Sequence, residues 1–288
     1  MSTELHVLNT GQSDCIILQS EGHLAMIDAG EDSDYPKEKP WLNYKGYEDK
    51  IVNYLFNNFK QEDGKVYIDF IVATHSHSDH IGGFDTIINH PKIVVKKAYV
   101  KSYHGSDTNL FERTFWDNSE VYKQLIQSIN QKGIFVKQRY DVGDLLGTCR
   151  IRFYNYQYTK PRFLKRGENT NSIVLSIRET ISGTRLLLMS DLNYRYKFER
   201  KILKQLSRYH VDILKVGHHG HLGSTPAKFL KKISPTISIV CGSQEKASKF
   251  VNWKLQKYSE YVQYTSGRSG DDLLILIRKD DDFERRGH

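Results

Sequence analysis

The chain has 288 residues, of which 39% are hydrophobic and 26% are charged, and its formal net charge is +8. This composition is typical of a folded protein and excludes a disordered or collagen-like chain. No run approaches the roughly 18 apolar residues of a membrane-spanning helix, so we expect no membrane span, one domain over residues 1–288 and a cytoplasmic location, with a secreted mature form as the alternative.

In chain order, the apolar pattern predicts strands and helices that alternate along the whole sequence. Strands are expected at Leu5–Leu8, Cys15–Gln19, His23–Ile27, Ile68–Ala73, Ile93–Val100, Ile134–Gln138, Cys149–Tyr154, Ile173–Ile177, Arg185–Met189, Asp212–Val216, Thr236–Cys241, Tyr261–Thr265 and Leu273–Ile277. Helices are expected at Tyr47–Lys60, Ser119–Lys132, Tyr196–Ser207 and Ala227–Ile233. Groups of strands separated by helices in both halves favour an α+β fold, a four-layer αββα sandwich of two mixed sheets with helices outside.

Charge and cysteine content narrow the classes of partner. A pI near 9.1 suits an anionic substrate or polymer. Basic residues are concentrated at Lys96–Lys101, Lys160–Arg166, Lys201–Arg208 and Arg285-Arg286, without regular interleaved aromatics, so a nucleic-acid partner is an alternative that this pattern does not favour. Cys15, Cys149 and Cys241 show no CxxC spacing, which predicts buried thiols and no disulfide.

A cluster of metal-ligating residue types directly follows the strand predicted at Ile68–Ala73. His75, His77, Asp79 and His80 place three imidazoles and a carboxylate within six residues. Zinc prefers these ligands, and a loop so dense in them supplies two ions a few ångströms apart, which activate a water molecule. A polar loop with coincidental histidines is the alternative, and the position at a strand end disfavours it. The sequence thus predicts a binuclear site with two Zn²⁺ ions, Mn²⁺ being the other candidate.

One loop cannot complete two sites, so the remaining ligands are expected at later strand ends. Asp191 emerges from an apolar strand and is interpreted as the ligand shared by both ions, the alternative being a helix N-cap. His218 and His219 follow the strand Asp212–Val216 and offer one more imidazole, and the sequence does not decide between them.

The segment His75-Ser-His-Ser-Asp-His80-Ile-Gly-Gly resembles the signature of the metallo-β-lactamase superfamily, and Asp28, Asp191 and His218-His219 resemble its later motifs in order. Further segments are similar to the branch shared by the hydrolase domain of competence DNA-uptake channels and by teichoic-acid phosphorylcholine esterases. These are Asn9-Thr-Gly-Gln-Ser-Asp14, Asn169-Thr-Asn-Ser172 and Lys215-Val-Gly-His-His-Gly220. The esterase catalytic domain is the closer of the two, on Met26-Ile-Asp-Ala-Gly-Glu-Asp-Ser-Asp-Tyr-Pro, Trp116-Asp-Asn and Val251-Asn-Trp.

The resemblance implies a role for each candidate ligand. It implies that His75 and His77 bind the first zinc, that Asp79 and His80 bind the second, that Asp191 bridges, and that His218 or His219 completes the second site. The usual third histidine of the first zinc is missing, because His90 and His104 do not follow suitable strands. Asn169 is interpreted as this ligand or as a residue that orients the bridging water, with a plain turn residue as the alternative. Asp79, Asn169 and His219 are accordingly expected to serve catalysis.

The function expected from this site is that of a metal-dependent phosphodiesterase resembling phosphorylcholine esterase. Lys101, Tyr103 and Tyr264 are candidates for contact with an anionic phosphodiester, and Trp41, Trp116 or Trp253 for a choline-like headgroup. The alternatives are a DNA nuclease of the competence-channel type, which the net charge favours, and a catalytically reduced metal-binding module. The sequence does not determine the oligomeric state.

Overall fold

Two seven-stranded sheets lie at the centre of the computed structural model, which describes residues 2–34, 36, 38–137, 143–157, 165–268 and 270–278. The first sheet has the order β16 (Leu273–Arg278), β1 (Thr3–Val7), β2 (Cys15–Ser20), β3 (His23–Ala29), β5 (Phe70–Ala73), β7 (Lys97–Val100) and β8 (Phe135–Val136). The second has the order β15 (Tyr261–Ser266), β14 (Ile237–Ser243), β13 (Ile213–Lys215), β12 (Arg185–Leu188), β11 (Val174–Glu179), β10 (Cys149–Tyr154) and β9 (Asp144–Leu146). A short parallel pair, β4 (Val66–Ile68) and β6 (Ile93–Val95), stands apart from them.

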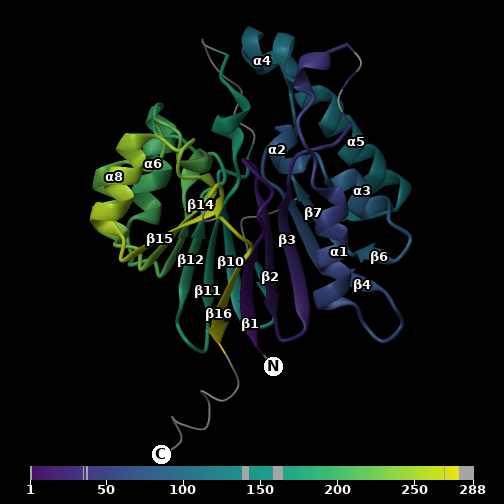
Figure 1. Cartoon of the computed structure of the whole chain (residues 1–288), viewed down its shortest axis with the longest axis horizontal. Helices are drawn as coiled ribbons and strands as arrows, with labels where there is room; N and C mark the ends of the chain where they lie inside the picture. Colours follow the sequence, from purple (N-terminus) through teal and green to yellow (C-terminus); the bar gives the residue numbers. More distant parts are fainter. Residues whose placement is uncertain are drawn as a thin grey trace, which may run out of the picture.

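Helices cover the outer face of each sheet (Figure 1). Beside the first sheet lie α1 (Glu48–Phe59), α2 (Ser78–Ile81), α3 (Phe84–Asn89), α4 (Leu110–Phe115) and α5 (Asn118–Gln131). Beside the second lie α6 (Lys197–Leu206), α7 (Ala227–Ile233) and α8 (Lys249–Tyr258). Four 3₁₀ turns are described: η1 (Pro40–Leu42), η2 (Gly105–Asp107), η3 (Glu168–Asn171) and η4 (Gly217–Gly220). The predicted αββα sandwich is confirmed.

The alternation of side chains along the strands explains the layers. In β2, Ile16 and Leu18 pack between the sheets, whereas Cys15 and Ile17 face the helices of the first sheet. Successive side chains of a strand point to opposite faces, so an all-apolar strand such as this one is buried on both sides. A third cluster, which includes Leu230, lies between the second sheet and its helices.

Parallel strands bring the functional loops to one edge. β3, β5 and β7 run parallel to one another in the first sheet, as do β12, β13 and β14 in the second. The carboxyl ends of parallel strands meet at one edge of a sheet, which is where open α/β sheets bind ligands. The loops after β3, β5, β12 and β13 therefore converge.

Several predicted elements need correction. The strand expected at Ile68–Ala73 is two strands that break at Asp69, whose backbone nitrogen donates to the Leu24 carbonyl, and the strand expected at Ile93–Val100 divides between β6 and β7. The sequence reading missed α3, α4 and α8 and the strand β9. The predicted strand end at Gln138, Lys160–Leu164 of one basic segment and Arg285-Arg286 lie outside the described residues.

Two other expectations concern the thiols and the membrane. Cys15, Cys149 and Cys241 are all buried and none forms a disulfide, as predicted. Among the described helices, none is both long enough and apolar enough to cross a bilayer.

Candidate metal centre

The loop after β5 presents the histidine cluster because its backbone changes conformation there. β5 ends at Ala73, the chain bends at His75 and Ser76, and His77 is extended, with φ −88° and ψ 145°. α2 begins at Ser78, which turns Asp79 and His80 onto the first turn of a helix. Two imidazoles thus come from the loop after β5, and the next carboxylate and imidazole come from the helix.

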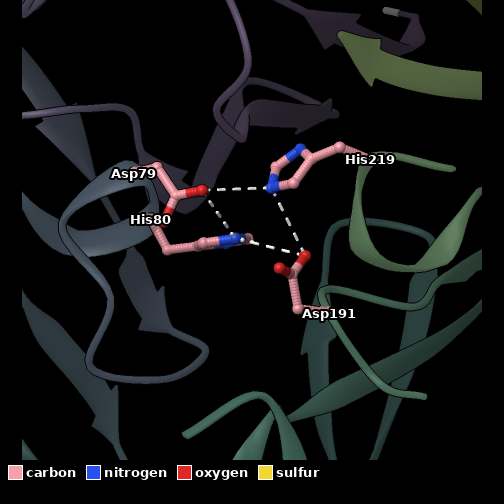
Figure 2. Close-up of side chains that lie close together, drawn as sticks. All are labelled: Asp79, His80, Asp191 and His219. Atoms are coloured by element: carbon pink, nitrogen blue, oxygen red, sulfur yellow. Dashed lines mark ion pairs between the residues drawn. The ribbon is translucent and has the colours of Figure 1, made fainter. Parts of the chain in front are cut away.

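Asp79, His80, Asp191 and His219 form one candidate ligand set, with ligand atoms all within 4.8 Å of one another. Figure 2 shows these four side chains converging from three loops. Asp191 Oδ1 lies 3.2 Å from His80 Nε2 and 3.5 Å from His219 Nε2, and Asp79 Oδ2 lies 3.2 Å from His219 Nε2. The structure therefore places His219, of the histidine pair, in this set.

His75, His77 and Asp191 form a second candidate set, again with ligand atoms within 4.8 Å. Asp191 belongs to both sets, so the two sites adjoin at its carboxylate. His218 lies beside this set, with Nε2 at 3.6 Å from Asp191 Oδ2 and at 3.0 Å from Asn169 Nδ2. Asn169 is thus brought to the place where the sequence left the first site incomplete.

Buried polar atoms without a hydrogen-bond partner indicate whether these side chains could hold cations. His75 Nε2, His80 Nε2, His219 Nε2, Asp191 Oδ1 and Asn169 Oδ1 are buried, and none makes a hydrogen bond of good geometry with the described part of the chain. Leaving such atoms unpaired costs about 1–3 kcal/mol each. Every one is a donor of an electron pair, as a zinc or manganese ligand must be. The residues present therefore fit a pair of divalent cations.

Outer contacts orient the imidazoles of the four-residue set. Asp28 Oδ2 lies 2.7 Å from His80 Nδ1, and the same carboxylate accepts from the backbone and the hydroxyl of Thr74. The Cys241 carbonyl lies 2.8 Å from His219 Nδ1. Because each Nδ1 has an acceptor, each Nε2 is left for a metal, the usual arrangement around metal-binding histidines.

Glu112 on α4 performs the corresponding task for His77. Its Oε2 lies 3.2 Å from His77 Nε2 and also accepts from Asn118 Nδ2 and from the backbone nitrogen of Glu168. Glu112 therefore occupies the outer nitrogen of His77 and directs Nδ1 toward the centre. The sequence reading missed this residue because α4 was not predicted, although the pattern Asn109-x-x-Glu112 is an N-cap signal.

Lys215 balances part of the negative charge of the centre. Its fully buried ammonium pairs with Asp14, donates to the Ser190 carbonyl at 3.0 Å and lies 3.8 Å from Asp191 Oδ1. Burial lowers the pKa of Lys215, but the Asp14 carboxylate outweighs burial and raises it above the ordinary value. The lysine stays charged and links the loops after β1, β12 and β13.

Electrostatics of the bare side chains favour cations. Burial raises the pKa of Asp191, but His219 and His80 outweigh burial and hold it well below the ordinary value. Burial lowers the pKa of His80, but Asp191 and then Asp79 raise it well above the ordinary value. The Asp191 carboxylate is thus ionised and the His80 imidazole takes up a proton, which a metal ion would displace on binding, whereas burial holds the pKa of His75 well below its ordinary value. Burial likewise lowers the pKa of His218 to about 4 and keeps it neutral.

Left-handed backbone conformations cluster at the centre. Asp28, Ser190, His218 and His219 have φ values of 58°, 46°, 49° and 46°. Non-glycine residues in this region cost about 1–3 kcal/mol when strained and gather at functional sites. Asp28 lies at the end of β3, Ser190 follows β12, and His218 and His219 follow β13, so left-handed backbone and candidate ligands occur at the same strand ends.

The predicted phosphate-contacting residues lie outside the two ligand sets. Lys101 is buried and donates to the carbonyls of Asn155 at 2.6 Å and Asn171 at 2.9 Å. The Tyr264 hydroxyl donates to Asn252 beneath α8. The Tyr103 ring centroid lies 5.6 Å from that of Tyr122, with the two rings tilted by 51°. Lys101 and Tyr264 thus form hydrogen bonds that hold neighbouring segments of the chain.

Of the three tryptophans, Trp116 lies nearest the ligands, with its ring centroid 4.7 Å from that of His77. Trp41 lies further out and donates to the Phe115 carbonyl. Trp253 is exposed on α8, where the Lys257 ammonium lies 5.2 Å from its ring. Only Trp116 thus borders the candidate metal centre directly.

Comparisons with known proteins agree with this geometry. Residues 8–115 match the model of the metallo-beta-lactamase superfamily. ComE operon protein 3 of Bacillus subtilis is 24% identical over 242 residues, which are 82% of this chain and 28% of that protein. The chain thus spans less than a third of the length of this relative.

Two solved structures share the fold over nearly the whole chain. The metallo-beta-lactamase fold protein YhfI from Bacillus subtilis superposes with a TM-score of 0.52 at 11% identity, covering 96% of this chain and all of that one. A diphosphatase from the PhnP family superposes with a TM-score of 0.52 at 14% identity, covering 96% of this chain and 98% of that one. With its two sheets and its convergent strand-end candidate ligands, the chain has the metallo-β-lactamase fold, and residues 8–115 match the model of that superfamily.

Proposed function

We propose that this chain is a binuclear metal-dependent phosphodiesterase that uses two Zn²⁺ ions, with Mn²⁺ as the other candidate. The observation that carries the proposal is the sharing of Asp191 between two adjoining ligand sets. Two cations so placed supply charge neutralisation at a phosphoryl group and lower the pKa of a water nucleophile. Metal-binding residues alone do not specify this reaction, so the surrounding side chains must support it.

The residues of the chain divide between binding and positioning. His75 and His77 are proposed for the first ion, Asp79, His80 and His219 for the second, and Asp191 for both. The Asn169 amide oxygen, buried and unpaired among the described residues, is proposed to complete the first set. The alternative role proposed for Asn169 is to orient the nucleophilic water through the same amide.

His218 is proposed to contact the substrate. Its side chain is 27% exposed, whereas that of His219 is 3% exposed. Nε2 of the neutral imidazole accepts from Asn169 Nδ2, and its single N–H, at Nδ1, faces Asn193 Oδ1. On substrate binding this N–H can turn from Asn193 to a phosphate oxygen or to the departing alkoxide. We therefore propose that the His219 imidazole faces the ions and the His218 imidazole faces solvent and substrate.

The choice of an anionic substrate is supported by charge. A phosphodiester is already anionic in its ground state, whereas a lactam develops one oxyanion only in the transition state. The net charge of +8 favours approach of an anion, and the fold is shared with a diphosphatase. Trp116 beside His77 supports an aromatic wall for a choline-like headgroup, which is the finer proposal of a phosphorylcholine esterase.

A DNA nuclease of the competence-channel type is the second candidate. The match to ComE operon protein 3 and the positive net charge favour it. Salt separates the two, because cleavage of a polymer held through many phosphates weakens steeply with ionic strength and cleavage of a small diester does not.

Metal analysis followed by a substrate screen tests the proposal. Protein purified without chelator is expected to hold about two ions per chain. Bis-nitrophenyl phosphate or nitrophenyl-phosphorylcholine is expected to be hydrolysed at least ~100-fold better in kcat/KM than a lactam, a gap of roughly 2.7 kcal/mol. A better lactam or thioester substrate would overturn the phosphodiesterase assignment. Fully loaded protein inert on every ester would point to a reduced metal-binding module.

A further inference from the structure

A second concave site lies on the outer face of the second sheet, beside the end of α6. It is a groove of about 560 Å³ between β10–β12 and the residues that follow α6. Five arginines line it: Arg150, Arg152, Arg178, Arg185 and Arg208. Figure 1 shows α6 and α8 on the β14–β15 side of this sheet, while the outer faces of β10 and β11 carry no labelled helix.

Strand register gathers these arginines in one row. In β10, Ile151 points between the sheets while Arg150 and Arg152 alternate with it and point outward. Arg150 pairs across the ladder with Arg178 of β11, and Arg178 pairs with Arg185 of β12. Three guanidinium groups therefore stand side by side across three neighbouring strands, a span of about 10 Å.

Within the part of the chain that the structure describes, no carboxylate lines the groove and none of the five arginines forms an ion pair. Asp212, next to the lining residue Val211, accepts from the Arg185 backbone nitrogen and pairs with His210 instead. Like charges opposite each other destabilise a sheet, so folding alone does not account for this row.

Aromatic rings accompany the charge. Tyr154 and Tyr209 line the same groove, and Tyr209 is 60% exposed. The Arg185 guanidinium lies 4.6 Å from the Tyr209 ring centroid. Exposed aromatics beside arginines are the usual surface on which bases of single strands stack while phosphates bind the cations. A site for simple anions has no need of such rings.

We propose that this groove binds the backbone of a single-stranded nucleic acid, apart from the metal centre. The three guanidinium groups stand about 4.8 Å apart from strand to strand, so their long side chains can each contact a neighbouring phosphate of one strand. The bound segment lies far from the ligands, since Arg178 near the end of β11 is six residues from Ser172, which precedes the strand and whose hydroxyl accepts from Asp191 N. That separation is about 20 Å. The groove thus holds a strand without taking part in hydrolysis.

Binding of a labelled phosphorothioate oligothymidylate of twelve nucleotides to the full, metal-loaded chain tests the inference. The triple variant Arg150→Ala, Arg178→Ala, Arg185→Ala is expected to bind at least about 30-fold more weakly at 100 mM salt. The slope of log affinity against log salt should become shallower by about 2, since each lost phosphate contact contributes about 0.7 for a single strand. Turnover of bis-nitrophenyl phosphate should stay unchanged, which separates this test from that of the proposed function.

The matched control removes the same charge elsewhere. Lys60, Lys65 and Lys92 are exposed on the α1 and β4–β6 side, and their triple alanine variant should stay within about threefold of wild type. Equal losses of oligonucleotide affinity in both triple variants would show that net charge alone explains binding, and would overturn the proposed groove. Tyr209→Ala should weaken binding of the oligonucleotide and leave binding of tripolyphosphate unchanged. If tripolyphosphate competed as well as the oligonucleotide at equal phosphate, the assignment to nucleic acid would be wrong.

Discussion

Replacing Glu112 by glutamine tests the most specific structural claim about the metal centre. Oε2 of Glu112 accepts from His77 Nε2, Asn118 Nδ2 and the Glu168 backbone. A glutamine can keep its oxygen at this position, so it preserves shape and one acceptor but removes the charge. Only the contact of Oε1 with Asn109 Nδ2, at 3.1 Å, meets an amide NH₂ instead. The perturbation is therefore electrostatic and centred on His77.

The expected size follows from what such carboxylates contribute to metal sites. Loss of a partner behind a metal-binding histidine costs about 10–100-fold in metal affinity. Because Glu112 touches only His77 among the proposed ligands, one of two dissociation constants should weaken by this factor. The other should stay within about threefold. Burial raises the pKa of Glu112, but the hydrogen bond and charge of His77, together with the contacts to Glu168 and Asn109, outweigh burial and lower the pKa below its ordinary value.

Chelator-competition titration with zinc resolves the two constants. Glu120→Gln is the matched control, because Glu120 is a partly exposed glutamate on the neighbouring helix that faces Lys39 at 4.0 Å and touches no candidate ligand among the described contacts. It should leave both constants unchanged. Equal weakening of both sites by Glu112→Gln, or no weakening, would refute the assignment of His77 to a site of its own.

Three further perturbations follow from the same contacts. Asp28→Asn should weaken the dissociation constant of the site that contains His80 about 10–100-fold, because Asp28 Oδ2 lies 2.7 Å from His80 Nδ1. A metal titration in which the His77 site weakened instead would contradict the two-set geometry. Asp191→Ala should lose one or both ions and nearly all turnover, because its carboxylate belongs to both sets; activity within about tenfold of wild type would make it a mere helix cap. Burial lowers the pKa of Lys101 to about 7, so between pH 7 and 10.5 the unfolded chain holds a proton that the folded chain has released. The free energy of unfolding should thus rise with pH, relative to Lys101→Met, by up to about 1.4 kcal/mol per unit in urea titrations, and a flat difference would show that the buried lysine stays charged.

Local patterns were sufficient for the layers and for most candidate ligands. Apolar strands such as Cys15–Ser20 and the carboxyl-end loops after them are written in consecutive residues, so period and position alone predicted the αββα sandwich. The cluster His75–His80 is equally local. Its ligand types lie within six residues, and their chemistry does not depend on distant chain.

Only the tertiary structure shows which residues distant in the sequence contact one another. His218 and His219 are adjacent in sequence, and only the left-handed turn after β13 points one toward Asp79 and the other toward Asn169. Lys101 is another case, because a lysine near a strand end looks like an anion contact until the carbonyls of Asn155 and Asn171 surround its ammonium.

The arginine groove shows the same limit most clearly. Arg150, Arg178 and Arg185 are dispersed over three strands, with no regular spacing that a sequence scan detects. Antiparallel register alone places them in one row, since the side chains that meet across a ladder belong to residues far apart in the chain. The sequence by itself determined which residues carry charge and which are of metal-ligating types, whereas pairing of the strands decided which of them lie together.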